Sequence, residues 1–194
     1  NCLIYAIILP TKGSIFIMED TICAISTSIG IGAISIVRVT GPDAIKIVDS
    51  IFDVNLTNKE THTIHYGHIK YNNEVIDEVL VMLMRGPKTY TTEDTIEINC
   101  HGGKSTTEKV LEILLASGCR LAEPGEFTKK AFLYGRINLL EAESVNDLIV
   151  AKTDAARTLA INNVDGILTK KIRNIREKIV KILANIEVNI DYPE

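Results

Sequence analysis

The stretch Thr95-Ile-Glu-Ile-Asn-Cys-His-Gly-Gly-Lys104 predicts a β-strand that turns directly into an α-helix. Its isoleucines alternate with Glu97 and Asn99, so one face of the strand is apolar and the other is polar. The Gly102-Gly103 pair permits a tight turn, and the helix that follows ends at Gly118. A helix N-terminus that is approached by glycine backbone suits an anionic or polar ligand.

A nucleotide-phosphate loop is not predicted at this turn, although Gly103-Lys104-Ser105 matches the end of a Walker A motif. That motif needs a glycine five residues before Gly103, where this chain has Ile98 inside the strand. The segment Asn58-Lys59-Glu60-Thr61 also fails as a guanine-specificity Asn-Lys-x-Asp motif, because its last residue is threonine. These residues therefore predict no nucleotide site.

The chain has 194 residues, of which 46% are hydrophobic and 24% are charged, a composition typical of soluble globular proteins. Lysine and arginine number 21 and aspartate and glutamate 25, so the formal net charge is −4. This balance excludes a protein held on nucleic acid by a general basic field. A nucleic-acid role would need a local patch or another part of a larger protein.

The cysteines and histidines predict neither a disulfide framework nor a metal site. The four cysteines contain no Cys-x-x-Cys pair, which favours reduced thiols in a cytoplasmic protein. His62, His65 and His68 repeat every third residue, but alternation along a strand sends His65 to the opposite face. Two imidazoles without a third ligand do not make a metal site.

Residues 1–17 are interpreted as an upstream or added segment, with Met18 as the natural start. The segment has no basic region or small-residue cleavage site, so no secretory signal is predicted. Its apolar run is too short to span a bilayer, and no membrane association is predicted.

Residues 18–121 predict an α+β domain. Beyond the strand and helix quoted above, the pattern predicts strands over 21–27 and 33–39 and a helix from Pro42 to Ile51. It also predicts a hairpin of strands 63–71 and 75–84 around Asn72-Asn73.

Residues 122–194 predict the first helices of an all-α domain that is incomplete in this chain. One apolar stripe, spaced by three and four residues over about six turns, indicates a helix that must lie in a bundle. The stripe consists of Leu168, Ile172, Ile175, Ile179, Ile182, Ile186 and Ile190.

Three charged residues are candidates for ligand binding, each with a plainer alternative. Arg38 shares a strand face with two isoleucines, so its guanidinium must find a carboxylate, a ligand or water. Glu97 lies on a polar face and either binds a ligand or faces solvent. Arg136 follows Gly135 at the end of a short helix, where it either binds a ligand or complements the helix dipole.

Eight short motifs follow one another along the chain from Met18 to Glu194. They are Asp20-Thr-Ile-Cys-Ala-Ile25, Ile36-Val-Arg-Val-Thr-Gly41, Tyr90-Thr-Thr-Glu-Asp94, Cys100-His-Gly-Gly103, Pro124-Gly-Glu-Phe-Thr128, Ala131-Phe-Leu-Tyr-Gly-Arg136, Leu140-Glu-Ala-Glu143 and Ile190-Asp-Tyr-Pro-Glu194. Together they resemble the N-terminal half of the MnmE (TrmE) family of tRNA-modification GTPases. Cys100 departs from the glycine that the family often has, and Asn138 from its aspartate.

The resemblance implies an activity, cofactors and partners. The family acts with a flavin-dependent partner, MnmG, to install an aminomethyl or carboxymethylaminomethyl group at C5 of the wobble uridine in certain tRNAs. Its N-terminal domain binds 5-formyltetrahydrofolate or 5,10-methylenetetrahydrofolate as one-carbon donor and forms the homodimer. A GTPase domain that uses GTP, Mg and K is inserted into its helical domain. That domain lies outside this sequence, so no catalytic residue is predicted here.

The resemblance also implies folate contacts at Arg38, Glu97 and Arg136, the last of which is lysine in some members. His101, Gly102 and Gly103 are secondary candidates beside the turn. A carboxylate such as Glu97 can pair with the donor edge of a pterin, and an arginine can clamp the glutamate tail of a folate. The sequence leaves open which arginine contacts which part of the ligand.

Two other functions remain open at this point. A folate-dependent aminomethyltransferase-like protein would use a related folate domain, and a non-catalytic assembly module would use the helices only to dimerise. The isoleucine stripe of a partial bundle favours the tRNA-modification reading over an independent enzyme.

Overall fold

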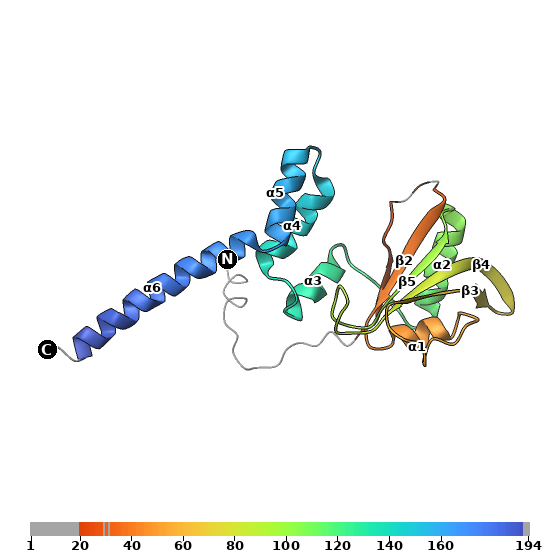
Figure 1. The fold of residues 1–194 in the computed structure, drawn as a ribbon. Coiled ribbons are helices and arrows are strands. Elements are labelled where there is room, and N and C mark those ends of the chain that lie inside the picture. The colour runs from red at the N-terminus through yellow and green to blue at the C-terminus, as the bar shows by residue number, and fades with distance from the viewer. Residues whose placement is uncertain (1–19, 29, 31, 192–194) are drawn as a thin grey trace. The chain divides into compact units, whose positions relative to one another are not determined.

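A computed structural model describes residues 20–28, 30 and 32–191, so the predicted upstream segment 1–17 lies outside the described residues. The chain divides into two compact units (Figure 1). The first unit holds the residues up to Thr89 together with Glu93–Ala122. The second holds Tyr90–Thr92 and the residues from Glu123 onward.

Six strands of the first unit form one sheet. They are β1 (Ile22–Ile25), β2 (Ile34–Thr40), β3 (Thr63–Tyr71), β4 (Glu74–Met84), β5 (Thr95–His101) and β6 (Arg120–Leu121). Their order across the sheet is β3-β4-β5-β2-β1-β6, and neighbours are antiparallel except for the β1–β6 pair. The predicted hairpin is confirmed, because Asn72 and Asn73 connect β3 to β4 with φ angles of 50° and 65°.

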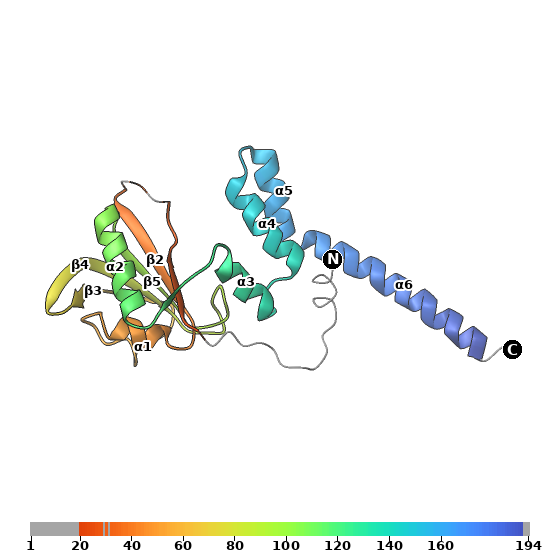
Figure 2. The same cartoon turned by 180° about the vertical axis from the view of Figure 1, so that it is seen from behind.

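The core of the first unit lies between one face of the sheet and two helices (Figure 2). The helices are α1 (Ala44–Asp49) and α2 (Lys104–Ala116). Val37 and Val39 of β2 and Ile96 and Ile98 of β5 are fully buried on this face, as the alternation predicts. The predicted first helix is shorter than expected, because Pro42 and the following residue form a turn before it.

The opposite face of the sheet, called the open face here, keeps large apolar side chains exposed. Antiparallel register aligns its rows across β3, β4, β5 and β2. The exposed apolar members are Ile34, Ile64, Tyr66 and Leu80. The polar members of β5, Glu97 and Asn99, point to the same side, as predicted from their alternation with buried isoleucines.

The described residues from Glu126 onward form helices joined by short connections, which confirms the predicted change from α+β to all-α structure. Its helices are α3 (Glu126–Leu133), α4 (Leu139–Val150), α5 (Asp154–Val164) and α6 (Ile167–Asp191). Gly135 ends α3 with a φ of 73°, and Gly166 separates α5 from α6 with a φ of 72°. Asn138 begins α4 in a capping box with Glu141.

Helix α6 carries the predicted apolar stripe but has no buried residue among those described. Ile172, Ile179 and Ile186 are each about half exposed, at 54%, 52% and 49%. A helix with an uncovered stripe gains little from packing and is marginally stable in water. No helix of the described residues is both long and apolar enough to cross a membrane.

Gly102 fits tightly against the segment that leads into β2. Its N–H donates to the Ala33 carbonyl at 3.1 Å, and its carbonyl accepts from the Gly32 N–H at 3.2 Å. A Cβ on Gly102 would lie 2.3 Å from the Gly32 carbonyl oxygen, whereas one on Gly103 would meet nothing closer than 3.7 Å. The glycine requirement at this turn therefore lies at Gly102, and its cause is close backbone approach.

Hydrogen exchange should reveal the difference in packing between α6 and the sheet. We expect the amides of Ile172–Ile190 to exchange far faster than those of β5, since local opening of α6 exposes little additional apolar surface. Mass spectrometry or NMR of this chain measures both regions in one experiment. Equal protection in the two regions would mean that the stripe is buried by self-association.

Alanine at the two glycines should have unequal effects on stability. Gly102→Ala forces a methyl group into the Gly32 backbone and should cost about 2–3 kcal/mol, at the upper end of overpacking. Gly103→Ala is the matched control and should cost about 1 kcal/mol or less, since it only replaces a helix N-cap glycine. Urea unfolding followed at NMR signals of β5 measures both. Equal costs would contradict the close approach.

Candidate functional site

Arg38 and Glu97 form an ion pair on the open face. They lie directly opposite each other in the antiparallel β2–β5 pair. The Arg38 Nε and Nη2 atoms both lie 2.8 Å from the same oxygen, Oε1 of Glu97. Their side chains are 29% and 16% exposed, so the pair is partly shielded yet reachable from solvent. Arg38 thus has a carboxylate partner on its own sheet.

The pairing leaves one acceptor of Glu97 available. Both arginine contacts use Oε1, and within the described residues Oε2 of Glu97 accepts no hydrogen bond. The guanidinium holds Oε1, because two of its donors converge on that oxygen. A ligand N–H group on the open face would therefore find Oε2 available as a charged acceptor.

His101 lies at the other end of β5 and is held by Asp77 of β4. The Asp77 carboxylate accepts from the His101 backbone N–H at 2.9 Å and contacts Nδ1 of the ring at 2.7 Å. This hydrogen bond, together with the Asp77 charge, raises the pKa of His101 above its ordinary value. The ring is 67% exposed and the Asp77 side chain only 8%, so the pair presents imidazole to the solvent.

A groove of about 340 Å³ lies on the open face beside His101. Its lining includes Ile34, Tyr66, Glu78, Leu80, Asn99 and His101. The Tyr66 hydroxyl donates a short hydrogen bond to Glu78 at this groove. Glu97 and His101 are four residues apart on one strand, or about 13 Å, so only an elongated ligand would contact both.

The two turn glycines have different surroundings from those predicted. The sequence predicts that the Gly102-Gly103 backbone approaches a ligand closely. The space above Gly102 is instead filled by the Gly32 backbone, and Gly102 is buried. Gly103 is exposed at the N-cap of α2, and its carbonyl accepts from the backbone N–H and the hydroxyl of Thr107, each at 3.0 Å.

Arg136 belongs to the second unit, whereas Arg38 and Glu97 belong to the first. Its backbone N–H donates to the Ala131 carbonyl at 2.9 Å, which closes the C-terminus of α3. Its guanidinium carbon lies 4.8 Å from the centre of the Tyr90 ring. The Tyr90 hydroxyl in turn lies 2.9 Å from Oγ1 of Thr128.

Three neighbours of the candidate residues were missed by reasoning from the sequence. Tyr90 and Thr128 lie within motifs that carry the resemblance, yet no pattern indicated that they position Arg136. Asp77 was missed as well, because its partner His101 is 24 residues away. Asp77 lies beside Glu78, just before the continuous apolar run 79–84 of β4, and no pattern there singled it out.

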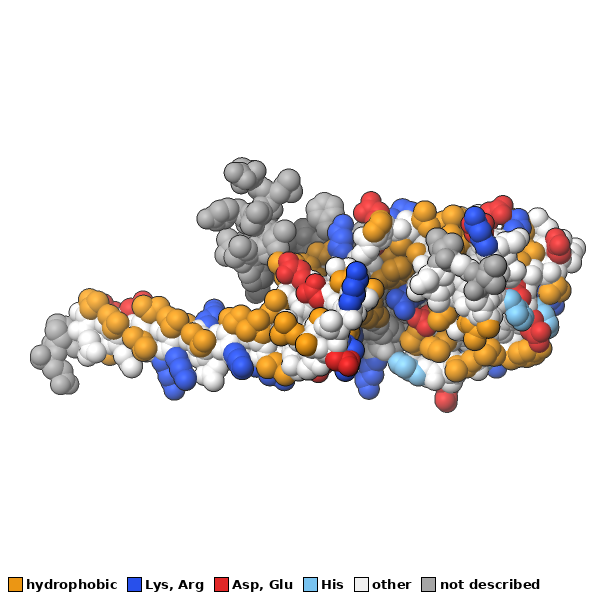
Figure 3. Space-filling view, turned by 90° about the horizontal axis from the view of Figure 1, so that it is seen from above, with side chains coloured by type: hydrophobic (Ala, Val, Ile, Leu, Met, Phe, Trp, Pro, Cys, Tyr) orange, Lys and Arg blue, Asp and Glu red, His pale blue; other side chains and the backbone are white. Residues whose placement is uncertain are grey.

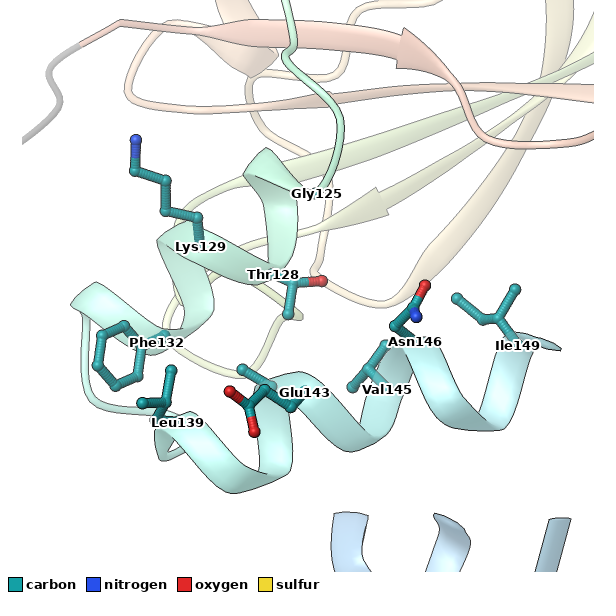
Figure 4. Close-up of a pocket in the computed structure, with 10 residues that line it drawn as sticks. Gly125, Thr128, Lys129, Phe132, Leu139, Glu143, Val145, Asn146 and Ile149 are labelled. Carbon is teal, nitrogen blue, oxygen red and sulfur yellow. The ribbon is translucent and has the colours of Figure 1, made fainter. Parts of the chain in front are cut away.

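A second groove, of about 490 Å³, lies between α3 and α4 (Figure 4). Phe132 and Leu139 close one end of it, and Asn146 and Ile149 line the other. Lys129 points away from α4, so the groove itself is mainly apolar.

Glu141, the first acid of the Leu140-Glu-Ala-Glu143 motif, has a structural role at the start of α4. Its carboxylate accepts from the Asn138 backbone N–H at 3.0 Å, while the Asn138 side chain accepts from the Glu141 N–H at 3.0 Å. The Asn138 amide also donates to Oγ1 of Thr169 in α6 at 3.0 Å. Asparagine at position 138 therefore keeps a capping role and adds a link to α6.

The cysteines among the described residues lie in the core of the first unit. Cys23, Cys100 and Cys119 are free and buried. Burial, with a smaller effect of Asp77, raises the pKa of Cys100 to about 12, so this thiol stays protonated at neutral pH. Among the described residues, no group of three or more Cys, His, Asp or Glu side chains could hold a metal ion.

Two family profiles match consecutive parts of the chain. The profile described as "GTP-binding protein TrmE N-terminus" matches residues 21–136. The profile described as "MnmE helical domain" matches residues 139–194. The first covers the sheet and the Arg136 turn, and the second covers α4, α5 and α6.

Curated relatives agree with the profiles. The tRNA modification GTPase MnmE of Listeria welshimeri is 59% identical over 177 residues, that of Lactococcus lactis is 58% identical over 176, and that of Bacillus mycoides is 60% identical over 178. In each case the match covers 90% of this chain and 39% of the relative's length. The chain therefore belongs to the MnmE (TrmE) family of tRNA modification GTPases, of which it spans the N-terminal and helical regions.

Proposed function

We propose that this chain is the folate-binding and dimerising part of a GTPase that, with MnmG, modifies C5 of the wobble uridine in tRNA. The observation that carries the folate proposal is the Arg38–Glu97 pair on the open face, with Oε2 of Glu97 still available as an acceptor. A bound folate, in the 5-formyl or 5,10-methylene form, would supply a one-carbon unit there.

The donor and acceptor set fits a folate. The pterin ring offers N–H donors, and Oε2 of Glu97 is a charged acceptor beside the oxygen that Arg38 contacts. The other end of a folate carries carboxylates, which suit a cation such as Arg136 or the imidazolium of His101. The raised pKa of His101 favours its charged form near neutral pH. The groove beside His101 offers apolar walls for the middle of such a ligand.

The same open face is proposed to pair with a second copy of the chain. Ile34, Ile64, Tyr66 and Leu80 are between 47% and 65% exposed on neighbouring strands. A contiguous apolar surface of this kind is typical of protein interfaces. A homodimer formed there would also shield the Arg38–Glu97 pair from water.

The remaining activities are proposed for the complete protein, of which this chain is a part. Its relatives carry the name tRNA modification GTPase, and this chain spans 39% of their length. GTP hydrolysis with Mg and K, the contact with MnmG and the modification of tRNA are therefore assigned to the complete protein. Free, buried thiols in the described residues support a reducing compartment such as the cytoplasm. An aminomethyltransferase-like function has less support, because the relatives described above carry the tRNA-modification name.

Calorimetric titration with 5-formyltetrahydrofolate should show that Glu97, unlike an exposed acid elsewhere, contributes to folate affinity. In Glu97→Gln the Arg38 donors retain the amide oxygen, so the amide NH₂ occupies the place of Oε2 and faces a ligand donor. The expected loss of folate binding is on the order of 2–4 kcal/mol, the scale for breaking a buried charged hydrogen bond. Glu112→Gln, an exposed acid of α2, is the matched control and should bind normally. Unchanged affinity in a folded Glu97→Gln protein would remove Glu97 from the site.

Light scattering should place the dimer contact on the open face. The wild-type chain is expected at twice its mass of 21.4 kDa at micromolar concentration. Leu80→Lys introduces a charge into the proposed contact and should give a monomer, whereas Leu115→Lys on α2 should remain dimeric. A dimer that survives Leu80→Lys but is lost in Ile179→Lys would locate the contact on α6 instead.

A further inference from the structure

Helix α6 concentrates positive charge that the rest of the chain lacks. Six cations, Lys170, Lys171, Arg173, Arg176, Lys178 and Lys181, fall within 12 consecutive residues that contain one acid, Glu177. The local formal charge is +5, in a chain whose net charge is −4. The neighbouring α4 has the opposite character, since it carries three acids and no cation.

Half of these cations lie opposite the apolar stripe. At roughly 100° per residue, Lys170, Arg173 and Lys181 fall within about 80° of one another, diametrically opposite the stripe, and Glu177 falls in the same sector between them. Lys171 and Lys178 lie on one shoulder of this sector and Arg176 on the other. Figure 3 shows hydrophobic side chains along one side of α6 and Lys and Arg side chains along the other. We call Lys170, Arg173 and Lys181, with these three neighbours, the basic face of α6.

The basic face is available for an external partner. All six cations are exposed, and within the described part of the chain none forms an ion pair. Any helix that covers the apolar stripe would leave the opposite side of α6 in water. Lys170, Arg173 and Lys181 therefore stay accessible whether or not the stripe is covered.

We propose that the basic face of α6 binds the phosphate backbone of structured RNA, with tRNA as the ligand. This inference rests on the proposed function, in which the complete protein acts on tRNA. Six cations over about 17 Å of helix match the dense, regular negative charge of a nucleic-acid backbone. Because phosphates carry no sequence information, this surface would position tRNA without selecting the anticodon.

An RNA partner explains α6 better than a membrane surface does. Helices that lie in a membrane interface place Trp, Phe and Leu in the lipid, and α6 contains no aromatic residue. Its stripe is mainly isoleucine at spacings of three and four, which is typical of a seam between helices. The apolar side is thus suited to protein packing, and the basic side is left for a polyanion.

The test compares two triple variants of this chain with equal net charge. Lys170→Gln, Arg173→Gln and Lys181→Gln together remove the three cations opposite the stripe and leave Glu177 in place. The control combines Lys46→Gln, Lys59→Gln and Lys109→Gln, three exposed cations of the first unit. Fluorescence anisotropy measures binding to an unmodified tRNA transcript between 50 and 300 mM KCl, conditions in which phosphate contacts give strong salt dependence, about one unit of log–log slope per contact.

We expect the α6 variant to lose about tenfold or more in affinity at 0.15 M salt and to flatten the salt slope by roughly two to three units. The control should bind as the wild type does, and a second tRNA with another anticodon should show the same loss. Equal losses in both variants, no loss in either, or no binding by the wild type would overturn the proposal. So would a loss seen with anionic phosphatidylserine vesicles but not with tRNA.

Folate titration of the same variants separates this inference from the proposed function. Both variants should bind 5-formyltetrahydrofolate normally, because their substitutions lie outside the open face. Normal folate binding without the tRNA effect would overturn the α6 assignment and leave the proposed function intact. A tRNA effect in a chain that binds no folate would support the basic face and count against the folate site.

Discussion

The antiparallel register between β2 and β5 is the constraint on which the first unit depends. It sets Arg38 opposite Glu97 and, one position away on each strand, sends valine and isoleucine side chains into the core. A slip of one residue would exchange these faces, exposing the apolar rows and burying two charges. The cost of burying unpaired charge thus protects both the fold and the proposed binding surface.

Local signals in the sequence were sufficient for most of the elements. Alternation of isoleucine with polar residues predicted β5, paired asparagines predicted the β3–β4 hairpin, and the isoleucine spacing predicted α6. These features depend on residues within a few positions of one another, so they can be predicted from local sequence patterns. The ends of α1 were less predictable, because turn and helix geometry compete around Pro42.

The candidate site was harder to predict because its contacts join distant segments. Arg38 and Glu97 were identified separately, and their pairing follows from a register between residues 59 positions apart. Glycine is needed at position 102 because the Gly32 backbone lies close to it, and the Arg136 guanidinium lies over the ring of Tyr90. A resemblance to a family can identify such residues in a single sequence, but it does not show which other residues they contact.

The position of Tyr90 bears on how this protein can be dissected. Three residues, Tyr90–Thr92, belong to the helical unit although the sheet surrounds them on both sides in the chain. A fragment cut at Glu123 would keep Arg136 but lose the aromatic ring that lies against it. A helical fragment that starts at Glu123 is therefore incomplete, and an insertion or deletion near Tyr90 would affect helices that begin more than thirty residues later.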